Sequence, residues 1–203
     1  MKKQQLSVEE KRLDTELWII LLVTLGVFFF YAAIDNQIMD FIKDDRISII
    51  PRLLLNAVVQ FGVAGLGITI VCILRKEKFT HFGLTRKNIF KAILGTTICF
   101  IPSICYTFMS GQFTGYQPFS IQITDDVIAS GTPFSIIGMA LIIIVWGFFE
   151  GFNYAVICEK INRRYPSKNQ WLDYGAITCA LICIAFHPFS TSFWGIVEVI
   201  TTF

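Results

Sequence analysis

Charged residues are scarce in this sequence. Only 16% of its 203 residues are Asp, Glu, Lys or Arg, whereas 54% are hydrophobic and the mean hydropathy is +0.62. A soluble domain of this length needs a larger polar surface than this composition supplies. The scarcity of charge therefore excludes an ordinary soluble domain and indicates a polytopic α-helical membrane protein.

Paired-cysteine motifs and repeats are also absent. The six cysteines show no CxxC spacing and lie within or at the edges of apolar runs. This pattern disfavours thiolate zinc sites and a secreted disulfide framework, and it favours cysteines that pack as small hydrophobic residues. No internal repeat divides the chain.

Long apolar runs fill most of the sequence. A membrane-spanning helix takes roughly 18–20 residues, and five runs approach or exceed that length, with a marginal sixth at the end of the chain. We therefore predict an all-α transmembrane helical bundle with five spans and a marginal sixth. Residues 1–16 form a charged N-terminal segment and residues 17–203 the helical domain. The runs cover 17–34, about 53–74, about 89–109, about 134–157, about 171–187 and 189–203.

The distribution of lysine and arginine predicts the orientation. The N-terminal segment and every second loop after it together carry fourteen of these residues, whereas the intervening loops carry three. Positive residues collect on the cytoplasmic side of a membrane, so we predict a multi-pass protein of the cell (plasma) membrane with a cytoplasmic N-terminus. Anionic lipid accounts for the basic loops, and nucleic acid is not needed as a partner.

Ionisable residues deep inside the apolar runs are few, and two of them stand out. Glu150 lies in the fourth run and His187 ends the fifth. Such groups are costly in hydrocarbon and usually mark functional sites that face the bundle interior. At 100° per residue, Asn153 and Tyr154 lie about 60° and 40° to either side of Glu150 on the same helical face. We predict Glu150 and His187 as catalytic residues, with Asn153 and Tyr154 in support.

These residue types suit hydrolytic chemistry. A carboxylate in an apolar site is suited to act as a general base on water, and neutral imidazole binds metals or accepts a proton. The alternative at Glu150 is a buried hydrogen-bonded contact that joins helices without catalysis.

The segment "FFEGFNYAVICEKINRRYP" and the later "FHPF" resemble the CPBP family of intramembrane metalloproteases, the CAAX-prenyl-protease-like proteins. The family pattern is EExxxR on one membrane helix and FxxxH on the next. "FGLTRKNIFKAI" resembles the segment that precedes its core helices, so the resemblance covers about 79–203. It implies a glutamate-activated water, Glu150 and His187 as zinc ligands, and a peptide or protein substrate at the cytoplasmic face.

The chain departs from the family pattern at several positions. If Glu150 is the second glutamate of the first motif, Phe149 and Tyr154 stand where the pattern has its other glutamate and its arginine; if it is the first, Gly151 and Ala155 stand at those positions. The family also has a third motif with a histidine on a further helix, and no histidine follows His187. Two further hypotheses therefore stay open. One is a catalytically degenerate CPBP-like protein with an immunity or partner-binding role. The other is a small-molecule transporter component that uses Glu150 and His187 as substrate or proton contacts.

Overall fold

The computed structural model describes residues 6–83, 87–109, 121, 123–169, 172–186, 193 and 196. All regular structure in these residues is helical, and no strand occurs among them. They form two compact units, Met1–Lys78 with Gln117–Val156, and Phe79–Tyr116 with Ile157–Phe203.

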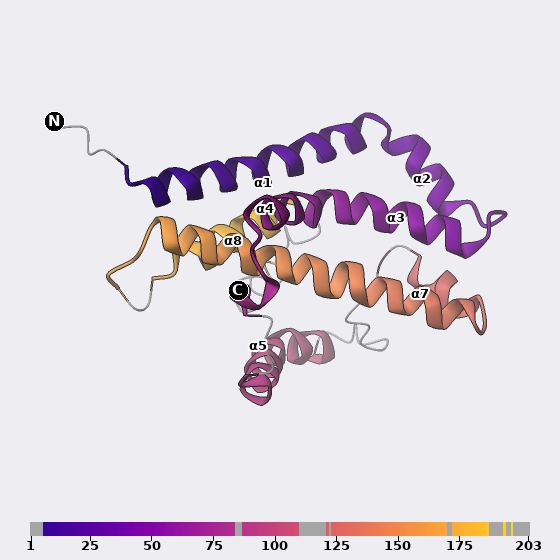
Figure 1. Ribbon diagram of the computed structural model, residues 1–203. Helices are drawn as coiled ribbons and strands as arrows, with labels where there is room; N and C mark the ends of the chain where they lie inside the picture. The colour runs from indigo at the N-terminus through magenta and orange to yellow at the C-terminus, as the bar shows by residue number, and fades with distance from the viewer. Residues whose placement is uncertain are drawn as a thin grey trace. The chain divides into compact units, whose positions relative to one another are not determined.

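The first unit is built around three long helical segments. Helix α1 (Val8–Ala33) packs along α3 (Ile49–Ala64), and α2 (Asp35–Lys43) connects them at one end. On its other side α3 contacts α7 (Phe134–Ile142) and the π-helical segment η2 (Ile143–Phe149), so α3 lies between α1 and α7 (Figure 1). Helix α4 (Leu66–Arg75) returns against α1, and α6 (Thr124–Ala129) packs on α7.

The first helix begins with a capping box. The Glu10 backbone N–H donates to Ser7 Oγ over 3.2 Å, and the Ser7 N–H donates to Glu10 Oε2 over 2.7 Å. These bonds satisfy N–H groups that lack a partner inside the helix. Helix α1 therefore starts within the charged segment and runs on without a break into the first apolar run.

Close packing in this unit depends on glycine where backbones meet. A side chain at Gly67 of α4 would place its Cβ only 3.0 Å from the Cα of Ile20 in α1. Small residues let membrane helices approach in this way. A compact apolar core lies where α2, α3, α6 and α7 meet, and it is made of Ile38, Ile42, Ile49, Leu53, Ile123, Val127 and Ile142.

The second unit contains the 3₁₀ turn η1 (Phe79–Phe82), α5 (Ile89–Met109), the C-terminal part of α8 (Glu150–Arg164) and α9 (Tyr174–Phe186). Lys160 of α8 is fully buried, with its Nζ 5.2 Å from the centre of the Phe82 ring. We predicted Lys160 in a basic loop, and this was wrong, because α8 continues to Arg164.

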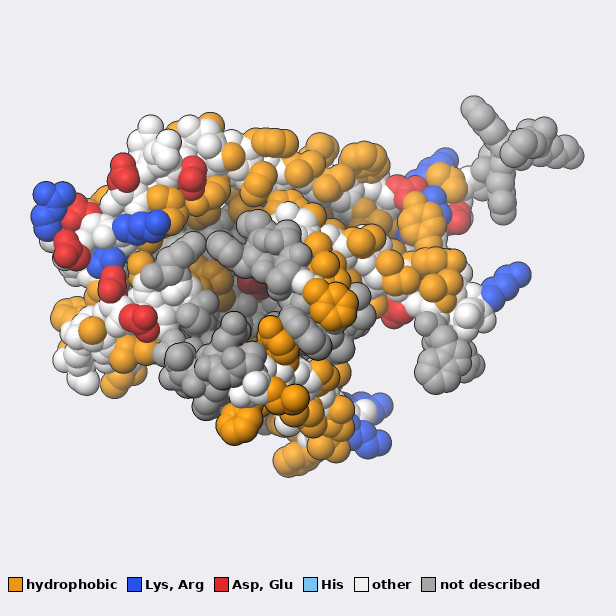
Figure 2. Space-filling model, turned by 180° about the vertical axis from the view of Figure 1, so that it is seen from behind, with side chains coloured by type: hydrophobic (Ala, Val, Ile, Leu, Met, Phe, Trp, Pro, Cys, Tyr) orange, Lys and Arg blue, Asp and Glu red, His pale blue; other side chains and the backbone are white. Residues whose placement is uncertain are grey.

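Among the described residues, three helices are long and apolar enough to cross a membrane: Val8–Ala33, Ile89–Tyr106 and Phe134–Arg164. A fourth span is obtained if α3 and α4, bent by 57° at Gly65, count as one. Their apolar side chains are widely exposed; Phe90, for example, is 84% exposed. In Figure 2 hydrophobic side chains form a band along the upper edge, where α1 lies, with charged side chains gathered at its ends. These are features of a membrane protein.

The predicted five spans are therefore not confirmed, and the described residues contain three or four candidate spans. The fifth run gives α9, whose 13 residues are fewer than a membrane-spanning helix needs. The second run is divided at Gly65, and the predicted loop after the first run contains α2. The sixth run lies outside the described residues except for Phe193 and Ile196. No observation tests the predicted division of the chain at residue 17.

Candidate functional site

Glu150 lies where a π-helix returns to α-helix. The seven residues Ile143–Phe149 are π-helical, and the Glu150 backbone N–H donates to the Val145 carbonyl, five residues earlier. π-Helical turns are rare and often occur at functional sites, because they change which face of the helix the following residues occupy. The first α-helical residue after this segment is the predicted catalytic glutamate.

The Glu150 side chain is held by a residue of another helix. Gln60 Nε2, on α3, donates a hydrogen bond of 2.9 Å to Glu150 Oε2. Both residues belong to the first unit, and Glu150 is half-buried. A carboxylate away from water requires such donors. Glu150 therefore points toward α3, and the Gln60 amide fixes one of its oxygens.

Aromatic rings surround this hydrogen bond. The residue after Gln60, Phe61, meets the residue before Glu150, Phe149, edge to face with ring centres 5.3 Å apart. Phe148 contacts Phe149 edge to face at 5.3 Å and stacks on Phe152 at 5.6 Å. Such aromatic pairs prefer these geometries. The contact of Phe61 with Phe149 joins α3 to η2, next to Gln60 and Glu150 in the sequence.

Asn153 and Tyr154 lie one turn along α8 from Glu150. Asn153 is 8% exposed, and within the described part of the chain its side chain makes no hydrogen bond. Tyr154 is half-buried. The Asn153 amide can bind a water or a polar group of a substrate near Glu150.

His187 lies outside the described residues, so its predicted approach to Glu150 remains a prediction. Among the residues that are described, no three His, Cys, Asp or Glu side chains form a group able to hold a metal ion. Glu150 is the one predicted zinc ligand within that set, and Gln60 donates to its Oε2. Zinc bound by Glu150 and His187 stays a prediction of the family resemblance.

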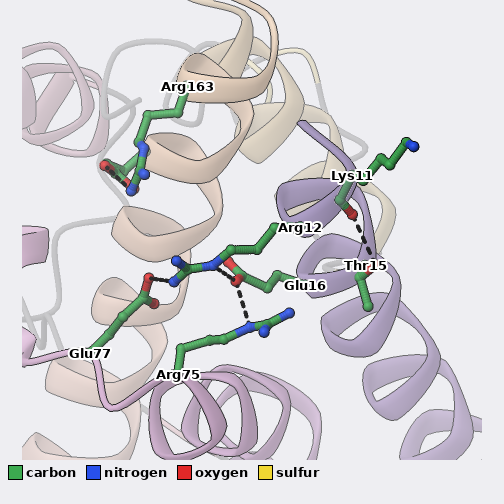
Figure 3. Close-up of polar contacts among 8 residues, drawn as sticks. Lys11, Arg12, Thr15, Glu16, Arg75, Glu77 and Arg163 are labelled. Carbon is green, nitrogen blue, oxygen red and sulfur yellow. Dashed lines mark hydrogen bonds and ion pairs between the residues drawn. The ribbon is translucent and has the colours of Figure 1, made fainter. Parts of the chain in front are cut away.

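A second polar cluster joins α1 to the end of α4. Glu16 is 1% exposed, and its Oε1 forms ion pairs with Arg12 Nε and with Arg75 Nε, each at 2.8 Å. Arg12 also reaches Glu77 at 3.1 Å (Figure 3). A buried carboxylate requires such pairing. The cluster has the geometry of a structural network, in which two arginines pair with one buried acid and Arg12 also pairs with Glu77.

A third cluster fixes the start of α9. Asn162 Nδ2 donates to Asp173 Oδ1 over 2.8 Å, and the Gly175 N–H donates to Asn162 Oδ1 over 2.8 Å. The Ala176 N–H donates to Asp173 Oδ1 over 2.7 Å, as in a helix cap. This backbone bond, with help from Asn162, lowers the pKa of Asp173 below its usual value.

Sequence reasoning missed Gln60 and Glu16. It considered ionisable residues inside the apolar runs, whereas Gln60 is a neutral amide near the middle of the second run. A buried amide in a span is a comparable signal, because neighbouring helices must satisfy it. Glu16 was assigned to the charged segment, and its position directly before the first run gives no sign that α4 covers it.

Comparison of the chain with protein-family models, with curated proteins and with solved structures finds no match.

Proposed function

We propose that the protein is a CPBP-like intramembrane peptidase in which Glu150 activates water to cleave a peptide or protein at the cytoplasmic face of the cell membrane. The observation that carries the proposal is the hydrogen bond from Gln60 to Glu150 inside an apolar helical unit. An oriented carboxylate in apolar surroundings is a suitable general base. The family resemblance supplies the reaction class and the substrate class.

In this mechanism Glu150 removes a proton from a water molecule as the water oxygen attacks the peptide carbonyl carbon. The proton then passes from Glu150 to the leaving amine as the C–N bond breaks. Gln60 holds one carboxylate oxygen and so orients the carboxylate. The open amide of Asn153 is a candidate donor to the substrate carbonyl oxygen. No step is assigned to zinc, since Glu150 is the one predicted ligand among the described residues.

The test replaces Glu150 by glutamine, which keeps a hydrogen-bonding oxygen but removes the basicity. Cells producing the native chain or Glu150→Gln are compared by chemical labelling of new protein N-termini in their membrane fractions. We expect cleavage products that depend on the native chain and disappear in the variant. Glu159→Gln, which changes another glutamate of α8, is the matched control and should keep them. The proposal is wrong if native and variant cells give the same set of N-termini.

The Gln60–Glu150 bond also favours a second candidate, a catalytically degenerate CPBP-like protein that binds a membrane partner. In that case the carboxylate serves only to join α3 to α8. Glu150→Gln should then retain full biological activity and normal stability, whereas Glu150→Leu should lose both, because Gln60 is left unpaired. Loss of activity in a stably folded Glu150→Gln variant excludes this candidate.

A further inference from the structure

A hollow of about 480 Å³ lies at one end of the first unit. It is formed where α3 and α7 begin, so it lies beside Ile49, the first residue of α3, and Phe134, the first residue of α7. Each of these helices opens a candidate membrane span. The start of a span lies near the boundary between hydrocarbon and lipid headgroups. With these helices across the membrane, the hollow would lie at the depth of the headgroups.

Two arginines and two aspartates line the hollow: Asp45, Arg46, Arg52 and Asp126. Arg52 is 4% exposed and is fixed by Nε, which donates to the Ile42 carbonyl over 2.6 Å, and by Nη2, which pairs with Asp126. Buried arginine in such a fixed orientation can still donate from its second terminal nitrogen.

Arg46 is also paired with an aspartate, although its side chain is 86% exposed. Its Nε and Nη2 both donate to the Asp44 carboxylate over 2.8 Å. This pairing lowers the pKa of Asp44 to about 2, so the carboxylate stays ionised and keeps Arg46 in place. In both arginines Nη1 forms no hydrogen bond to the described residues. The hollow thus offers guanidinium donors for an anion.

The acidic side chains provide the complementary charge. Asp45 is exposed, and the Asp126 side chain is 50% exposed although it pairs with Arg52. Two positive and two negative groups give the lining no net charge. Phe134, 47% exposed, and Ile49 supply the apolar side of the hollow. This set of groups matches a zwitterion with an attached apolar chain.

We propose that this hollow binds the phosphoethanolamine headgroup of a phospholipid. The phosphate accepts hydrogen bonds from Arg46 and Arg52, and the ammonium donates to Asp45 and Asp126, while an acyl chain leaves along Phe134. Arginine suits phosphate because its donors match the phosphate oxygens. A phosphocholine headgroup lacks N–H donors for the aspartates, and phosphoglycerol lacks the cation. The site does not depend on the chemistry proposed for Glu150.

The test is native mass spectrometry of the purified full chain after incubation with equal amounts of phosphatidylethanolamine, phosphatidylcholine and phosphatidylglycerol that carry the same acyl chains. We expect phosphatidylethanolamine to be retained about tenfold over the other two. The double variant Asp45→Asn, Arg46→Gln should lose this preference. The control Asp40→Asn, Lys43→Gln makes the same charge changes at exposed residues of α2 outside the hollow and should keep it.

Soluble phosphoethanolamine distinguishes the headgroup from the whole lipid. If a millimolar excess displaces the bound lipid, the headgroup provides the recognition, as proposed. Equal retention of the three lipids, or the same preference in the Asp45→Asn, Arg46→Gln variant, would overturn the proposal. Retention of phosphatidylglycerol above the others would also overturn it, because it would show a simple anion site.

Discussion

Replacement of Glu16 by glutamine tests the charged cluster between α1 and α4. The change keeps the size of the side chain and removes its charge. Hydrogen bonds between charged groups contribute about 1.5–3 kcal/mol each, and Glu16 receives two, from Arg12 and Arg75. These arginines are 38% and 34% exposed, so solvent screening reduces the sum. We expect the free energy of unfolding to fall by about 2–3 kcal/mol.

The melting temperature of the detergent-solubilised protein is determined from the amount that stays soluble and monodisperse after heating. For a chain of this length the expected loss corresponds to a decrease of about 4–12 °C. Asp40→Asn removes one negative charge at an exposed position of α2 and should leave the melting temperature unchanged.

A double-mutant cycle identifies the partner. If Glu16 acts through Arg75, then Glu16→Gln combined with Arg75→Gln should cost about 1 kcal/mol less than the sum of the single changes. Additive effects, or a Glu16→Gln variant that melts with the control, would refute the reasoning. Additive effects would mean that Glu16 does not act through Arg75, and an unchanged melting temperature would mean that the buried acid contributes no more than its desolvation takes away.

Three further changes test other contacts. Gly175→Ala should lower the free energy of unfolding by about 1–3 kcal/mol, because the added Cβ would clash with the Cys158 carbonyl oxygen. The control Gly151→Ala, whose Cβ would have nothing within 4 Å, should leave it unchanged. Equal melting temperatures of the two variants would contradict this. Asp173→Ala should lower the melting temperature through loss of a helix cap of about 1 kcal/mol. Because the pKa of Asp173 is lowered on folding, that difference should be full above about pH 4 and vanish as the pH falls further; a constant difference down to pH 2 would be inconsistent. Arg52→Met should lower the free energy of unfolding by about 1–3 kcal/mol, since a buried carbonyl loses its donor; an unchanged melting temperature would count against this.

Composition was sufficient to predict an all-helical chain with helices of membrane-spanning length. The third and fourth runs became α5 and the continuous helix from Phe134 to Arg164. Hydropathy could not predict the bend at Gly65, because both α3 and α4 are apolar and only the packing of α4 against α1 shows where the chain turns. It also missed α2, whose mixed sequence "DNQIMDFIK" is helical because Ile38 and Ile42 pack into the core beside α3.

The candidate site was predicted less completely. The cost of a carboxylate in hydrocarbon directed attention to Glu150, and the structure gives Glu150 a partner on another helix. The identity of that partner could not be read from the sequence, because Gln60 lies 90 residues away and the pairing depends on how α3 packs against α8. Local periodicity describes one helix at a time, whereas this contact is a property of the bundle.

The π-helical segment shows why helical periodicity works on one side of Glu150 and fails on the other. Within α8 the spacing of 100° per residue holds, so Glu150, Asn153 and Tyr154 keep their predicted relation. A helical-wheel projection that starts at Phe134 has to cross seven π-helical residues, in which each backbone hydrogen bond spans five positions instead of four. Each such turn takes an extra residue, and the face that it predicts for Glu150 is therefore displaced. The carboxylate is directed at Gln60 by the π-helix as much as by its position in the sequence. An alteration to residues 143–147 should therefore disturb the site without changing the side chains that form it.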